Sequence, residues 1–150
     1  MKMILALCLV LGFNFAQAAN ILQEGQYQGK GIVTLLTGQQ IPFTISTTSA
    51  HTGDHSETIT DTYAFPDGTS YVNVYDISVT NSIMTVTRNG IPAGTGYCVE
   101  SSCHLTYFFA DTGVSGEESL IVSGDRIERI GSRSVSGVLQ YVKTSLVKVK

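Results

Sequence analysis

The chain has 150 residues, of which 43% are hydrophobic and 14% charged, and its formal net charge is −3 at pH 7. This length fits a single domain, which is large enough to bury a core without a metal or many disulfides. Six of the nine basic residues fall within 126–150, which we interpret as basic strands that pair beside acidic ones. Without a nucleic-acid-binding motif, this distribution argues against a nucleic-acid partner.

Residues 1–18 have the pattern of a secretory signal peptide. Lys2 precedes an apolar run that starts at Met3, and the segment ends in Ala16-Gln17-Ala18, a small-x-small sequence that signal peptidase accepts. The apolar run is too short to cross a bilayer. We therefore expect cleavage after Ala18 and a mature single domain of residues 19–150. The protein would be bacterial, periplasmic or secreted, and without a transmembrane anchor.

The rest of the chain alternates strand patterns with turn patterns. In the segment QIPFTIST, residues 40–47, Ile41, Phe43 and Ile45 recur at the period of two that marks a half-buried strand. Later segments are rich in threonine, valine, isoleucine and tyrosine, which favour strands. These strand segments are 57–65, 69–80, 104–110, 119–123 and 136–150.

Three short sequences between these segments predict turns. In Pro66-Asp67-Gly68 the proline fixes its own φ at a value that suits a turn, and the glycine can adopt the left-handed conformation. Asn81-Ser82 and Asn89-Gly90 are two-residue turns, and Asn-Gly is the strongest short hairpin signal. Consecutive hairpins on this scale predict an all-β chain of about 8–10 antiparallel strands.

An up-and-down β-barrel is the architecture we expect, because closure removes the exposed edges of a long meander. A two-sheet β-sandwich is the alternative, since both show the same period of two. Glycine placement favours the barrel: Gly25, Gly29 and Gly31 share one face of the first strand, and Gly94 and Gly96 share a face of a later one. Glycine at such positions lets a strand bend or another backbone approach.

The first strand, GQYQGKG at residues 25–31, resembles the opening strand of lipocalin-like (calycin) barrels, which begin Gly-x-Trp, and also that of nitrobindin-like barrels. Both families are barrels whose apolar interior binds a small molecule or haem. The resemblance implies that Gly25 and Tyr27 close one end of the barrel and that Arg129 or Arg133 covers the tyrosine ring. Tyr27 replaces the family's tryptophan, and the absence of a histidine after His104 does not support haem ligation.

Aromatic residues at strand positions are the candidates to line a ligand site inside such a barrel. Their hydroxyl groups favour a partly polar ligand, because each buried hydroxyl needs a partner. The alternative is that the same rings fill the core and leave no cavity. The candidate ligand-binding residues are Phe43, Tyr63, Tyr71, Tyr75, Tyr107, Phe109 and Tyr141.

The sequence HTGDHSE at residues 51–57 carries two of the three histidines beside two acids. His51 and His55 flank a turn, so both imidazoles could reach one ion that Asp54 or Glu57 completes. Neutral imidazole and carboxylate suit zinc or copper. The alternative is a polar loop at the mouth of the barrel, whose ordinary composition is the same.

Cys98 and Cys103 are the only cysteines after the signal peptide. The four residues between them predict a tight turn, and opposed Cβ atoms across a hairpin lie close enough for a disulfide. The alternative is a metal-binding pair with His104. A disulfide agrees with an exported protein.

The sequence contains no motif that pairs a nucleophile with its base, no phosphate-binding glycine loop and no dinucleotide-binding motif. We therefore do not expect an enzyme. The first functional class we expect is an exported barrel that binds a small, apolar or partly polar ligand. The second is a filled barrel that acts through its loops on another envelope or extracellular protein, as an inhibitor or host-directed factor. The third is a metal-handling protein that uses the His51 and His55 loop.

Overall fold

The structure is a computed structural model that describes residues 20–149. The predicted signal peptide and its cleavage site lie outside the described residues. Ten strands follow one another along the chain, and their bounds are β1 (Gly25–Leu35), β2 (Gln40–Gly53), β3 (Ser56–Ala64), β4 (Ser70–Thr80), β5 (Ile83–Arg88), β6 (Ile91–Val99), β7 (Ser102–Phe109), β8 (Val114–Ser123), β9 (Arg126–Val135) and β10 (Val138–Lys148).

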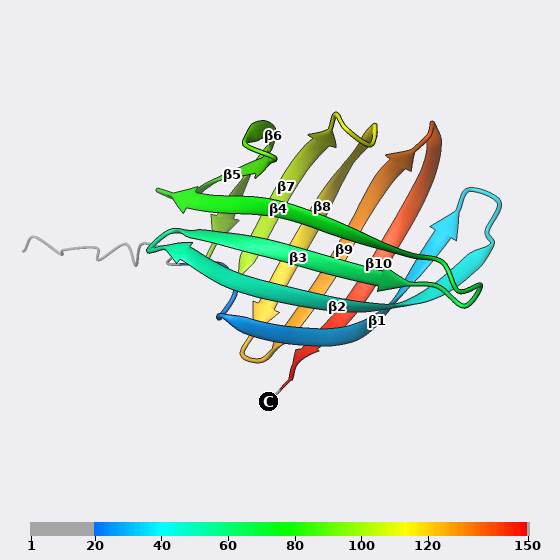
Figure 1. The fold of residues 1–150 in the computed structure, drawn as a ribbon, viewed down its shortest axis with the longest axis horizontal. Helices are drawn as coiled ribbons and strands as arrows, with labels where there is room; N and C mark the ends of the chain where they lie inside the picture. The colour runs from blue at the N-terminus through cyan, green and yellow to red at the C-terminus, as the bar shows by residue number, and fades with distance from the viewer. Residues whose placement is uncertain (1–19, 150) are drawn as a thin grey trace, which may run out of the picture.

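The strands form one closed antiparallel barrel. Each strand pairs with the next along the chain, and β1 also pairs with β10, which closes the sheet (Figure 1). The predicted up-and-down β-barrel is therefore confirmed, and the sandwich is excluded. Over residues 20–149, no helix is long and apolar enough to cross a membrane.

The two-residue turns predicted at Asn81-Ser82 and Asn89-Gly90 are present. Asn81, Ser82, Asn89 and Gly90 all have positive φ, which the two-residue turns that match strand twist require. With hairpins this short, alternate turns gather at opposite ends of the barrel. One end carries the β2–β3, β4–β5, β6–β7 and β8–β9 turns, and the other end carries the remaining five.

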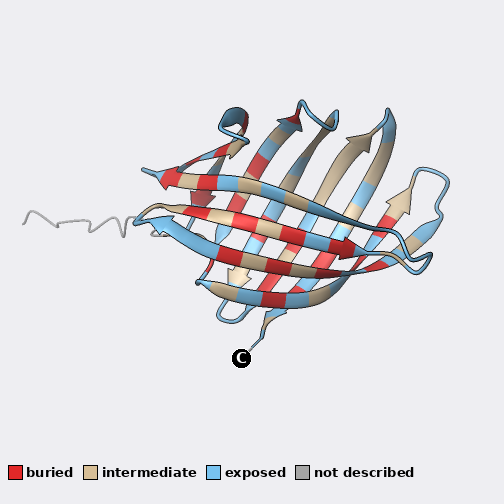
Figure 2. Cartoon of the chain, in the orientation of Figure 1, coloured by how far each residue is buried: buried red, intermediate tan, exposed pale blue. Residues whose placement is uncertain are grey.

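Burial alternates along the strands, as Figure 2 shows, because successive side chains point to opposite faces of the sheet. Several of the most deeply buried apolar residues lie toward the end of the barrel that carries the β2–β3 turn. Ile59, Met84, Ile127 and Leu146 are each at most 2% exposed there. This half of the barrel is filled by side chains.

Glycines bring β1 close to its neighbours. A Cβ atom at Gly29 would overlap the carbonyl oxygen of Ser145 on β10, and one at Gly31 would overlap the ring of Phe43 on β2. A larger residue at Gly29 would force β1 and β10 apart, and one at Gly31 would displace the Phe43 ring. The predicted close approach of another backbone is therefore present at Gly29, whereas an aromatic side chain packs over Gly31.

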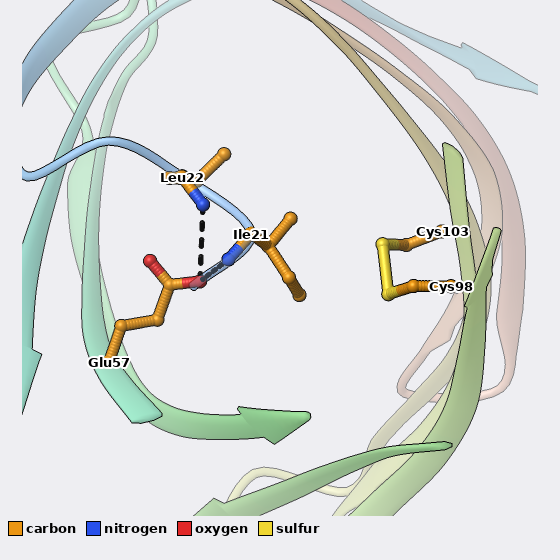
Figure 3. Close-up of a disulfide and its surroundings, with 5 residues drawn as sticks. All are labelled: Ile21, Leu22, Glu57, Cys98 and Cys103. Carbon is orange, nitrogen blue, oxygen red and sulfur yellow. Dashed lines mark hydrogen bonds between the residues drawn. A yellow bond between two sulfur atoms is a disulfide. The ribbon is translucent and has the colours of Figure 1, made fainter. Parts of the chain in front are cut away.

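The segment before β1 closes the filled end of the barrel. Leu22 is 6% exposed and packs with the core. The hydroxyl of Tyr27 donates to the carbonyl oxygen of Gln23 at 2.9 Å, and Lys148 donates to the side chain of Gln23 at 3.1 Å. Figure 3 shows Ile21 between Glu57 on one wall and the disulfide on the other.

Cys98 on β6 and Cys103 on β7 are directly opposed and joined by a disulfide. Both cysteines are buried, on the inner face at the filled end (Figure 3). The predicted pairing is present, whereas the alternative of a metal-binding pair with His104 would need free thiols.

Candidate ligand cavity

A cavity of about 360 Å³ occupies the half of the barrel that the core leaves open. It lies toward the end that carries the β3–β4, β5–β6, β7–β8 and β9–β10 turns, opposite the N-terminal segment. Its volume falls at the lower end of the range for sites that take drug-sized molecules. Its walls come from β3 to β5 on one side and from β7 to β10 on the other.

Five aromatic rings line the cavity. The rings of Tyr63 and Tyr71 stack with centroids 4.5 Å apart, and those of Tyr107 and Phe109 stack at 4.9 Å. Tyr75 lies 6.1 Å from Phe109 and connects the two stacks. Such flat walls suit a flat apolar ligand.

Strand β9 shapes the opposite wall through alternate residues. Arg129, Gly131 and Arg133 all line the cavity, since every second residue of a strand points inward. Gly131 contributes no side chain, and a Cβ atom there would overlap the carbonyl oxygen of Glu117. Gly131 therefore lets β8 and β9 approach closely at this level of the wall.

A buried charge cluster forms the floor of the cavity. Arg129 donates from Nη1 to both carboxylate oxygens of Asp61, at 3.0 and 3.1 Å, and from Nε to Glu118 at 2.8 Å. Asp61 also accepts hydrogen bonds from Thr47, Tyr63 and Tyr75. The floor thus holds two carboxylates and one guanidinium, with a formal charge of −1.

The charges in this cluster support one another. Burial by itself lowers the pKa of Arg129, but the charges of Asp61 and Glu118 overcome that effect and hold the pKa well above its ordinary value. Burial, together with the charge of Asp61, raises the pKa of Tyr63 and Tyr75 well above the ordinary 10.0. Arg129 therefore stays charged and both phenols stay protonated at neutral pH.

Two arginines lie nearer the mouth. Arg133 on β9 donates to the hydroxyl of Tyr71 on β4 at 2.9 Å, across the mouth, and to Gln140 at 3.0 Å. Arg88 pairs with Asp111 at 2.8 Å, hydrogen-bonds to Asn73 and lies 4.8 Å from the centre of the Phe109 ring. Burial, followed by the charge of Glu118, raises the pKa of Tyr107 to about 12, so this phenol also stays protonated at neutral pH.

The structure places five of the seven predicted ligand-binding residues on the cavity wall, namely Tyr63, Tyr71, Tyr75, Tyr107 and Phe109. Phe43 lies behind them, with its ring 5.5 Å from that of Tyr63. Tyr141 is 51% exposed on the outer face of β10, whose inward positions are Val142 and Thr144. Tyr141 points outward because it is the neighbour of the inward residue Val142, and neighbouring residues of a strand point to opposite faces.

Sequence reasoning did not single out the charged residues of the interior as a site. Asp61 interrupts the apolar face of the 57–65 segment, and that interruption was the available signal. Arg88 and Glu118 sit at inward strand positions too, but a single sequence does not show which carboxylate meets which arginine. The resemblance to lipocalin-like barrels placed Arg129 or Arg133 over Tyr27, whereas the cation over that ring is Lys148, at 6.0 Å.

The candidate metal residues lie at the filled end, away from the cavity mouth. Glu57 is 1% exposed and accepts hydrogen bonds from Ser49 at 2.6 Å and from the backbone of Ile21 and Leu22 at 3.0 and 3.3 Å. The Nε2 atom of His51 lies 2.8 Å from the carbonyl oxygen of Leu22. Asp54 lies in the exposed turn, and His55 is half-buried beside it.

Among residues 20–149, no three histidine, cysteine, aspartate or glutamate side chains are gathered as a metal site. The zinc or copper site thus stays a prediction from the sequence. Titration of zinc into the wild type and into His55→Ala tests it, and identical behaviour of the two would contradict it.

Comparison with known proteins shows the fold. No protein-family model matches the chain, and no curated protein matches it in sequence. It is similar to the solved structure of the S-type phycobiliprotein lyase CPES from Guillardia theta, with 13% identity, 85% of this chain and 89% of that chain covered, and a TM-score of 0.70. It is also similar to Rv2717c from M. tuberculosis, with 16% identity, coverage of 85% and 92%, and a TM-score of 0.64.

A third similar structure is EF1p2_mFAP2b bound to DFHBI, with 12% identity, coverage of 84% and 93%, and a TM-score of 0.51. At these identities the likeness concerns the fold alone. The chain thus has the closed antiparallel barrel of lipocalin-like proteins, as the first strand predicted.

Proposed function

We propose that this protein is exported and binds one small, largely apolar molecule in the barrel interior, without converting it. The observation that carries the proposal is the cavity of about 360 Å³ inside the barrel. Aromatic rings line it, and a few fixed polar groups stand at its floor and mouth, which is the usual composition of a small-molecule site.

The similar structures agree with binding in this fold. EF1p2_mFAP2b is a barrel bound to the small molecule DFHBI. CPES is named as a lyase, so the fold by itself is neutral about catalysis. We favour binding without conversion because the sequence carries no motif that pairs a nucleophile with its base.

Two observations support export. The first is the apolar run followed by Ala16-Gln17-Ala18 at the start of the chain. The second is the disulfide between Cys98 and Cys103, because such bonds persist in oxidising compartments. The alternative of a filled barrel that acts through its loops requires a dry core, and the open half of the interior weighs against it.

Titration with the neutral fluorescent dye N-phenyl-1-naphthylamine tests the binding proposal. The wild type is expected to bind one dye molecule with a rise in fluorescence. Val142→Trp places a large ring in the cavity and is expected to abolish binding. Lys143→Trp, one residue away on the outer face of β10, is the matched control and should bind as the wild type does. Equal binding by Val142→Trp and the wild type would overturn the proposal.

A further inference from the structure

The cavity has opposite charges at its two ends. At the mouth, Arg88 is paired with Asp111, but over residues 20–149 no carboxylate lies within 4.0 Å of Arg133. Arg133 uses Nε for Gln140 and one terminal nitrogen for Tyr71. Those partners are an amide and a hydroxyl, so among the described residues the guanidinium of Arg133 has no ion-pair partner within 4.0 Å.

The floor has an unmatched negative charge. Asp61 is fully buried and accepts five hydrogen bonds, from Arg129, Thr47, Tyr63 and Tyr75. Glu118 accepts hydrogen bonds from Arg129 alone, and its side chain is 16% exposed on the cavity wall. Each carboxylate oxygen can accept more than one hydrogen bond, so Glu118 is the acceptor that the floor offers to a ligand.

Glu118 and Arg133 reach the cavity at different depths. Glu118 lies opposite Gly131 in the pairing of β8 with β9 and accepts from Arg129 toward the floor, whereas Arg133 lies two residues beyond Gly131 toward the mouth. A ligand that meets both groups therefore carries its two polar ends apart. Gly131 places no side chain between the two arginines of β9, and stacked aromatic rings line the same cavity.

We propose that the ligand is a flat aromatic molecule with an anionic group at one end, bound by Arg133, and an N–H donor at the other end, bound by Glu118. This inference rests on the proposed function, because it describes the occupant of the same cavity. It assigns the charge at the mouth and the acceptor at the floor to ligand recognition.

Three naphthalene probes test the two ends separately. 6-Aminonaphthalene-2-sulfonate carries both groups at opposite ends of a flat ring system, 2-aminonaphthalene lacks the anion, and naphthalene-2-sulfonate lacks the amine. Their dissociation constants are measured by fluorescence at low ionic strength, because salt screens the charge of a partly exposed arginine. The wild type is expected to prefer the probe with both groups to either of the others.

Arg133→Gln is expected to reduce the preference for 6-aminonaphthalene-2-sulfonate over 2-aminonaphthalene by about tenfold, with little change for the uncharged probe. An interaction with a charged partner has about this effect. Arg133→Lys should restore part of the preference. Arg126→Gln removes the same charge from an exposed position on the same strand and should leave the preference unchanged.

Glu118→Gln is expected to reduce the preference for the aminated over the amine-free sulfonate, with circular dichroism as the check on folding. If both preferences survive the two substitutions while Val142→Trp still abolishes binding, this inference fails and the proposed function stands. If the protein binds N-phenyl-1-naphthylamine but neither sulfonate, this inference likewise fails and the proposed function stands. If neither the dye nor the probes enter the cavity, both proposals fail.

Discussion

Arg129 of β9 and Asp61 of β3, which lie 68 residues apart in the chain, form a buried ion pair across the inside of the barrel, with Nη1 3.0 Å from the nearer carboxylate oxygen. The Asp61 side chain has no solvent exposure and that of Arg129 has 9%. This pair separates the filled half of the interior from the cavity. It connects two walls that are not neighbours in the sheet.

Asp61→Asn is expected to lower the free energy of unfolding by about 3 kcal/mol or more. Removing one partner leaves the other charge buried with less compensation. Urea unfolding measures the change. Asp76→Asn on the neighbouring strand is the matched control, because Asp76 is exposed, and it should cost about 0.5 kcal/mol or less. Equal losses in the two variants would contradict the role of the pair.

Glu57 is expected to make stability depend on pH. Burial raises its pKa above the ordinary 4.5, and hydrogen bonds from Ser49 and from the backbone of Leu22 and Ile21 offset part of the shift. Between 4.5 and the raised value the folded protein holds more protons than the unfolded chain. The contribution of Glu57 to the free energy of unfolding is therefore largest below 4.5 and falls as pH rises through the raised value.

Glu57→Gln lacks this titration. The unfolding free energy of the variant minus that of the wild type should thus increase as pH rises from 4 to 7. Urea unfolding at several pH values measures the difference. A difference that is constant over this range would show that Glu57 has the same pKa in the folded and unfolded states.

Reduction of the disulfide is expected to lower the free energy of unfolding by about 2 kcal/mol, the value for a loop this short in the chain-entropy account. Unfolding with and without a thiol reductant measures the change, and a mass gain of two hydrogens confirms reduction. Cys98→Ala with Cys103→Ala is the control, because its stability should not respond to the reductant. A response in that variant would mean that the reductant acts elsewhere.

Gly31→Ala is expected to destabilise the barrel by about 1–3 kcal/mol, because the new methyl group overlaps the ring of Phe43. Phe43→Leu should cost less in the Gly31→Ala background than in the wild type, since it relieves that overlap. A double-mutant cycle measures the interaction, which we expect to be about 1 kcal/mol. Strict additivity would show that the two residues do not compete for the same space.

Local features of the sequence were enough to predict most of the strands, several hairpin turns and the disulfide. The period of two at Ile41, Phe43 and Ile45 is a property of one strand, and the turn at Asn89-Gly90 is a property of two residues. Cys98 and Cys103 are close in the chain, so the hairpin between them settles their pairing. Each of these features depends on contacts within about one hairpin.

The candidate site was predicted only in part, for a related reason. Inward tyrosines such as Tyr75 and Tyr107 could be identified from strand alternation. For Tyr141 the prediction was wrong, because an error of one position in assigning the inward residues of a strand moves a side chain from the inner to the outer face.

The amino-acid sequence by itself determined that this chain folds as antiparallel strands joined by short hairpins, because strand alternation and turn geometry act over a few residues. Only the tertiary structure decided that half of the barrel stays open and that Arg129 meets Asp61 and Glu118 at its floor. The reason is that closure between β1 and β10 brings strands from distant parts of the chain to face one another across the interior. No local pattern records which side chains then meet.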